Sequence, residues 1–181
     1  MTYPWAAGET LTATDLNNYA GLIFIKSQTV TAGVSSVTVT DAFSSTFDNY
    51  RITLTGGASS ADGNVQMQLG STTTGYYAKL AYLPWGSTTW AFTTDSNAAL
   101  WTAPGVSRTT GLQAAVDLYQ PYAAARTVYE SRYVGPKTNS VFGTSGGFEN
   151  SATQHTSFTF SLSTGTFSFS PVIRVYGYNN G

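Results

Sequence analysis

The sequence contains no cysteine and very little charge, and each absence excludes a class of protein. Without cysteine, the 181-residue chain can form neither a disulfide nor a thiolate metal site. Charged residues make up 9% of the chain, against roughly 25% in ordinary soluble domains. The eight basic residues are scattered singly, so no basic run can follow a phosphate backbone and nucleic-acid binding is not expected.

Long hydrophobic runs are also missing. No stretch approaches the roughly 18 uninterrupted apolar residues of a membrane span, so no membrane insertion is expected. The N-terminus lacks the basic and apolar regions of a signal peptide. The chain is instead rich in Ser, Thr, Asn and Gln, and 14% of its residues are aromatic. Such a neutral polar surface suits either a protein that faces other proteins or a rugged extracellular domain.

From Leu22 onward, apolar and polar residues alternate with a period of two, which is typical of β-strands with one buried face. The expected strands are Leu22–Val30, Ser36–Thr40, Tyr50–Thr55, Asn64–Gly70, Gly75–Leu83, Thr88–Thr94, Leu112–Tyr119, Arg126–Val134, Ser140–Phe148, Thr156–Ser163 and Pro171–Tyr178. This spacing predicts an all-β fold, an antiparallel β-sandwich of jelly-roll type over residues 22–181.

Several connections are predicted from turn-forming residues. Leu112–Glu130 can be read as partly helical, although Pro121 interrupts it, or as two strands joined by a broad turn at Gln120–Ala125. Ser96–Gly111 is expected to be a long surface loop. Asp62–Asn64 and Asp95–Asn97 resemble fragments of calcium loops. Neither continues into a complete loop, so both are interpreted as turns.

One short helix is predicted before the strands, within residues 1–21. Thr12 is a good N-cap and Asp15, three residues later, completes a capping box. Leu11 and Leu16 stand where a hydrophobic staple would, and Gly21 stands where a glycine would end the helix. A helix of about two turns does not persist alone in water, so it must pack on its own domain or on a partner.

Three segments carry a resemblance to bacteriophage virion proteins. The pattern W-x-x-G-E-x-L-T-A-x-D-L-N, from Trp5 to Asn17, is similar to the opening of many phage tail and fibre proteins. Ser27–Gly57, with F-x-x-x-F-D-N-Y-R-I, and Phe158–Asn180, with I-R-V-Y-G, resemble the two ends of a β-sandwich module of phage virion proteins. The resemblance implies a non-enzymatic virion protein, usually a homotrimer or higher ring, without a cofactor.

The same resemblance implies how the protein assembles. Residues 1–21 would dock on other virion proteins, with Trp5, Leu11, Leu16 and Tyr19 as the apolar contacts, and the sandwich would face outward. The chain has no long coiled coil or β-helical shaft, which favours a compact tip, collar, baseplate or capsid-surface component over a long fibre. Of these positions, the tail or baseplate is the one expected. A capsid decoration or head-fibre protein is the alternative location on the particle.

The central aromatic residues are the strongest binding candidates, because flat rings stack on the apolar faces of sugars. The candidates are Tyr76, Tyr77, Tyr82, Trp85, Trp90 and Trp101. They raise the possibility of host attachment through a surface glycan, or of a carbohydrate-binding module as an alternative function. Aromatic residues also fill sandwich cores and subunit interfaces, and that interpretation is favoured for most of the six.

The remaining polar residues predict no catalytic or metal site. His155 is the only histidine, lies in a polar stretch and is interpreted as a surface or turn residue. No nucleophile elbow is present, and nothing in the sequence brings Glu130 and Glu149 together at a sugar. The arginines within the predicted strands, Arg51, Arg132 and Arg174, are expected to pair or extend at a sheet surface.

Overall fold

The computed structural model describes residues 8, 10, 12, 21–136 and 140–179. Within this part the chain forms fourteen strands and no helix, and every strand pairing is antiparallel, which confirms the all-β prediction. The predicted helix and the proposed docking residues Trp5, Leu11, Leu16 and Tyr19 lie outside the described residues. Among the residues described, no helix is long and apolar enough to cross a membrane.

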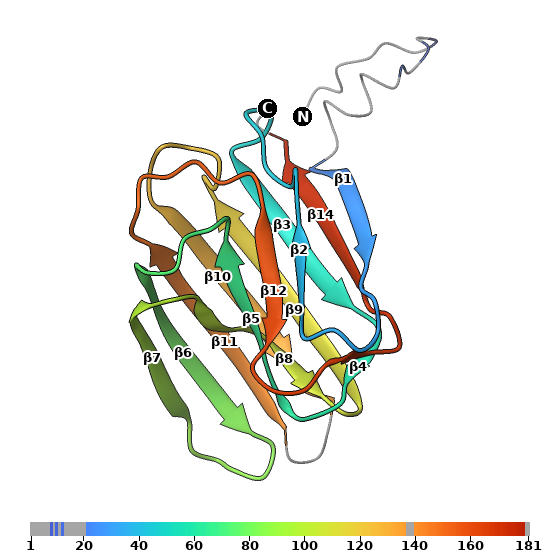
Figure 1. The fold of residues 1–181 in the computed structure, drawn as a ribbon, viewed down its shortest axis with the longest axis vertical. Coiled ribbons are helices and arrows are strands. Elements are labelled where there is room, and N and C mark those ends of the chain that lie inside the picture. The colour runs from blue at the N-terminus through green and yellow to red at the C-terminus, as the bar shows by residue number, and fades with distance from the viewer. Residues whose placement is uncertain (1–7, 9, 11, 13–20, 137–139, 180–181) are drawn as a thin grey trace.

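Eight strands form the larger layer of the structure (Figure 1). Their order is β7 (Ala91–Ala98), β6 (Tyr76–Pro84), β11 (Val141–Glu149), β10 (Thr127–Val134), β9 (Gly111–Tyr119), β3 (Asn49–Thr55), β14 (Val172–Tyr178) and β1 (Leu22–Thr29). The broad turn predicted at Gln120–Ala125 is confirmed, because it connects β9 to its hydrogen-bonded neighbour β10.

A second layer lies in front of the first in Figure 1 and is continuous with it through β9. It consists of β2 (Ser36–Val39), β12 (Phe158–Leu162), β5 (Gly63–Leu69) and β8 (Trp101–Arg108). The first half of β9 pairs with β8 and its second half pairs with β10, so the two layers diverge along one strand. A separate pair, β4 (Ala58–Ser59) with β13 (Phe167–Ser168), lies beside them.

Alternation along the strands places one side chain in two between the layers, where it is withdrawn from water. The fully buried large residues come from both layers: Tyr50, Ile52, Leu54, Leu118, Tyr129 and Tyr76 from the larger one, and Met67, Leu69, Trp101, Phe158 and Phe160 from the smaller one. In β3 and β9 every second residue is buried, as the alternation in the sequence predicts.

The prediction of a surface loop over Ser96–Gly111 is wrong, because β7 extends to Ala98 and β8, which is almost entirely buried, occupies residues 101–108. Pro104 falls at the irregularity in the pairing of β5 with β8, where no ladder hydrogen bond is lost. Gly105 is required for a different reason. A Cβ at this position would lie 2.5 Å from Cβ of Ala114 on β9, so only glycine allows the two strands to approach.

The prediction of a turn at Asp95–Asn97 is also wrong, since these residues belong to β7. The carboxylate of Asp95 is buried and accepts hydrogen bonds from the main-chain N and from Oγ1 of Thr102, at 2.9 and 2.8 Å. Asn97 has a positive φ of 52°, and its Oδ1 accepts a hydrogen bond from the main-chain N of Gly75. The polar residues that suggested a turn therefore fix an irregularity within the edge strand.

Side chains of β1 reach across to the edge of the smaller layer. Lys26 Nζ donates to the carbonyl of Thr40 at 2.6 Å, and Gln28 Nε2 donates to the carbonyl of Thr38 at 3.3 Å. β1 also brings the two ends of the described body together. Leu22 pairs with Tyr178, and the main-chain N of Asn179 donates to the carbonyl of Gly21.

Candidate functional site

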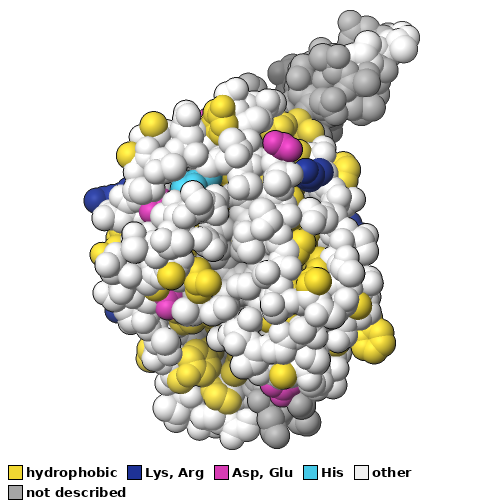
Figure 2. Space-filling view, viewed as in Figure 1, with side chains coloured by type: hydrophobic (Ala, Val, Ile, Leu, Met, Phe, Trp, Pro, Cys, Tyr) yellow, Lys and Arg dark blue, Asp and Glu magenta, His cyan; other side chains and the backbone are white. Residues whose placement is uncertain are grey.

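The outward side chains of the larger layer line up in rows across the sheet, because the strand register sets residues of neighbouring strands side by side. The central row runs through Thr94, Lys79, Gly146, Glu130, Asp117, Arg51, Tyr176 and Phe24. Four charged residues of a charge-poor chain thus lie in one line. Figure 2 views the molecule from the other side, over β2, β12 and β5, where few charged side chains are visible.

Part of this charge is neutralised within the row. Arg51 donates two hydrogen bonds to the carboxylate of Asp117, at 2.9 and 2.7 Å, and this pairing raises the pKa of the Arg51 guanidinium. Tyr178 Oη donates to the same carboxylate at 2.6 Å. Burial, together with this hydrogen bond, raises the pKa of Tyr178 to about 12. Asp117 is therefore held by partners from two neighbouring strands.

Three other charges of this face remain available to a ligand. Lys79 Nζ makes one hydrogen bond, to Thr94 Oγ1 at 2.8 Å, and retains two further donors. Glu130 and Arg132 are exposed and form no hydrogen bond or ion pair with another described residue. The sequence predicts that Arg132 pairs or extends at the sheet surface, and the structure places it free on that surface.

A groove of about 690 Å³ lies over this part of the sheet. Its hollow form follows from small residues at the centre, Ala81, Ala115, Thr144 and Gly146, surrounded by longer side chains. The surrounding side chains include Lys79, Phe92, Arg132, Glu130 and the Arg51–Asp117 pair. The volume falls within the usual range of about 300–1,000 Å³ for ligand sites.

Exposed aromatic and aliphatic side chains lie at the ends of the same face. Phe92, on the edge strand beside the groove, is 76% exposed. Trp90 packs edge-on against Phe142 with ring centroids 6.0 Å apart, and both are more than 40% exposed. Phe24, at the far end of the central row, is 56% exposed. Apolar patches of this kind on a protein surface mark sites of interaction.

The structure divides the six aromatic residues that the sequence offers as sugar-binding candidates. Tyr76 and Trp101 are wrong as binding residues, because both are fully buried and pack edge-on against each other at 5.1 Å. Tyr82 is half-buried, and Tyr77 stacks on Phe148 at 5.1 Å on the outer face. Trp85 and Trp90 are exposed at the connection between β6 and β7.

Sequence reasoning missed Phe92, Glu130 and Arg132 as residues of the groove. Their alternation marks them as outward-facing, but nothing in a single sequence shows that the side chains of six strands line one hollow. Glu149 is fully buried and Glu130 is exposed, so the structure does not bring these two carboxylates to one surface.

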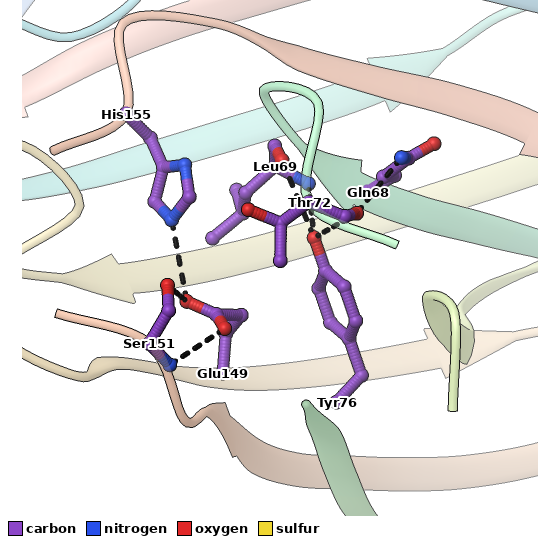
Figure 3. Close-up of polar contacts among 7 residues, drawn as sticks. All are labelled: Gln68, Leu69, Thr72, Tyr76, Glu149, Ser151 and His155. Atoms are coloured by element: carbon purple, nitrogen blue, oxygen red, sulfur yellow. Dashed lines mark hydrogen bonds and ion pairs between the residues drawn. The ribbon is translucent and has the colours of Figure 1, made fainter. Parts of the chain in front are cut away.

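A second polar cluster lies inside the protein, where the end of β11 meets the following loop (Figure 3). The prediction that His155 is a surface or turn residue is wrong, because its side chain is 1% exposed and lies 3.3 Å from Glu149 through Nε2 and Oε2. Ser151 donates to Glu149 through both its main-chain N and its hydroxyl, each at 2.7 Å. The Ser151 hydroxyl thus bonds to the carboxylate and not to the histidine, so His155 does not activate it.

Tyr76 lies beside this cluster and ties β6 to the end of β5 (Figure 3). Its Oη accepts a hydrogen bond from the main-chain N of Leu69 at 2.7 Å and lies 3.3 Å from the carbonyls of Leu69 and Thr72. Burial raises the pKa of the Tyr76 phenol, and the nearby charge of Glu149 adds to the effect. The geometry of the cluster holds the loop over residues 149–157 against the sheet.

The described residues contain no group of three or more His, Cys, Asp or Glu side chains placed to hold a metal ion. Comparison of the chain with protein-family models, curated proteins and solved structures finds no match. The outer groove offers free cationic and anionic groups and an exposed aromatic ring around a floor of small residues, which is an arrangement for binding.

Proposed function

We propose that the protein is a non-enzymatic structural component of a bacteriophage virion, located in the tail or baseplate and contributing to host attachment. In this proposal the two layers are a β-sandwich of jelly-roll type, residues 1–21 dock on other virion proteins, and the assembled form is a homotrimer. The larger layer presents its outer face away from the particle.

One observation carries the proposal: the two segments of the body that resemble phage modules are partners in space. Tyr50, Arg51 and Ile52 of the first segment pair with Gly177, Tyr176 and Val175 of the second. Phe47 fills the space over Gly177, where any Cβ would collide with its ring. The motif residues thus depend on one another, as expected if they belong to one inherited unit.

The position of this unit also supports a docking role for residues 1–21. β14 of the unit pairs on its other side with β1, and β1 begins directly after Gly21. A segment that docks on a particle would therefore be joined to the body through the strands that carry the resemblance.

The test is incorporation of a truncated chain into particles. We expect deletion of residues 2–21 to leave the strand-rich circular dichroism spectrum intact while abolishing incorporation. A truncated chain that enters particles as well as the full chain contradicts the proposal. Imaging of particles that carry the labelled full chain distinguishes a tail or baseplate position from a capsid position, and mass measurement of the isolated protein tests the trimer.

The groove favours glycan binding as a second candidate function, since it joins an exposed aromatic ring to free polar groups. In this function, the exposed Trp85 and Trp90 would contact the sugar at the edge of the face. Groove residues would take the place of Tyr76 and Trp101, which are buried.

A further inference from the structure

The groove carries unpaired groups of both signs. Its lining contains Lys79 and Arg132 as free donors and Glu130 as a free acceptor, while Arg51 and Asp117 neutralise each other. A polyanion would be attracted by Lys79 and Arg132 but repelled by Glu130. A cationic ligand would be attracted by Glu130 but repelled by Lys79 and Arg132. An uncharged ligand meets no such repulsion.

Hydroxyl groups match this lining, because each hydroxyl both donates and accepts hydrogen bonds. A ligand with several hydroxyls can accept from Arg132 and Lys79 and donate to Glu130 at the same time. Hydrogen bonds to charged groups are stronger than those between neutral groups. The ring of Phe92 supplies the apolar surface against which one face of such a ligand can pack.

The size of the groove favours a chain of sugars. Its volume of about 690 Å³ lies well inside the range of ligand sites, and it is open on one side, across β7, β6, β11, β10, β9 and β3. We infer that the groove binds an uncharged oligosaccharide, held by Arg132, Glu130 and Lys79 and packed against Phe92. The inference rests on the attachment role proposed above, and it names the class of ligand for that role.

Gly146 gives a direct way to block the groove. It occupies the centre of the charged row between Lys79 and Glu130, and a Cβ added there would lie 3.4 Å from its nearest neighbour, the carbonyl of Tyr129. A leucine side chain at 146 would therefore extend into the hollow without a backbone collision. Gly86, in the connection between β6 and β7, has open space around it and serves as the matched control.

The experiment uses the full chain on an array of defined oligosaccharides with neutral, carboxylated and sulfated members. We expect binding to neutral members, weakened about tenfold or more by Gly146→Leu and by Arg132→Ala, and unchanged by Gly86→Leu. Arg132→Ala alters only an exposed side chain, so it tests the groove even if Gly146→Leu fails to fold.

Three results would overturn the inference. These are no binding to any neutral member at about 1 mM glycan, binding restricted to charged members, or binding that Gly146→Leu and Arg132→Ala leave unchanged. A change in oligomeric mass caused by Gly146→Leu, without any glycan binding, would assign the face to contact between copies of the chain instead. The array separates this inference from the virion proposal, because the isolated protein can bind glycans whether or not truncated chains enter particles.

Discussion

A buried hydroxyl group can hold a loop of this protein against the sheet. Tyr76 is the clearest case, because its phenol stands between the end of β5 and the cluster of Glu149 and His155. We expect Tyr76→Phe to lower the free energy of unfolding by about 1–3 kcal/mol, since the buried main-chain N of Leu69 loses its acceptor.

The neighbouring tyrosine provides the control for this prediction. Tyr77 faces outward on the same strand and stacks on Phe148 through its ring, so Tyr77→Phe should change the unfolding free energy by less than about 0.5 kcal/mol. Urea unfolding followed by fluorescence measures both. Equal effects of the two substitutions would show that the Tyr76 hydroxyl has no special part in stability.

Residues also mark where sequence reasoning stopped. The alternation predicts that Ile52 and Leu54 are buried, and they are. The polar residues around His155 in the sequence predict that it is exposed. In the structure, the loop after β11 places His155 against Glu149, and both side chains are buried. A short stretch of sequence shows the alternation of a strand. It does not show which residue a loop side chain will contact, because that contact forms only when distant parts of the chain pack together.

Among the elements, β11 shows how two adjacent glycines serve opposite purposes. A Cβ at Gly147 would collide with the carbonyl oxygen of Tyr77 on β6, whereas one at Gly146 would meet only ordinary contacts. We expect Gly147→Ala to force β11 and β6 apart and to destabilise the protein by roughly 1–3 kcal/mol, as overpacking does.

Gly146→Ala is the matched control, one residue away in the same strand. It should leave the unfolding free energy within about 0.5 kcal/mol of the parent, because the added methyl group points into the groove. Thermal and urea unfolding of the two variants measure the difference. If Gly146→Ala proves as destabilising as Gly147→Ala, the sheet is less tolerant on its outer face than the geometry indicates.

Strands could be predicted from the sequence where apolar and polar residues alternate along them, but not where both faces of the strand are buried. The strands of the larger layer, such as β3 and β9, follow the expected period closely. β8 was missed, because burial of nearly every residue removes the alternation, and because Pro104 and Gly105 are typical of loops. The layer order and the groove, which depend on pairing between distant strands, had no local signal.

At the scale of the whole molecule, buried tyrosines make stability depend on alkaline pH. Burial raises the pKa of Tyr133 to about 12, above the usual value of about 10, and Tyr178 is shifted similarly. The folded protein therefore keeps phenolic protons at pH values where the unfolded chain releases them. The stabilising contribution is complete below about pH 10 and is lost as pH rises toward about 12.

We expect the free energy of unfolding to fall between about pH 10 and about pH 12, which urea titrations across this range measure. Tyr133→Phe should make the fall less steep, because it removes one of the shifted groups. An unfolding free energy that is the same at about pH 9 and about pH 11.5 would contradict the raised pKa of the buried Tyr133 and of the partly buried Tyr178.

The pairing of β1 with β14 has a mechanical consequence. Because Leu22 pairs with Tyr178, the two ends of the body leave the same end of one antiparallel ladder. A force that pulls these ends apart would load the ladder one pair at a time and unzip it from Leu22 toward Thr29. A tension applied through only one of the two ends does not load the β1–β14 ladder in this direction.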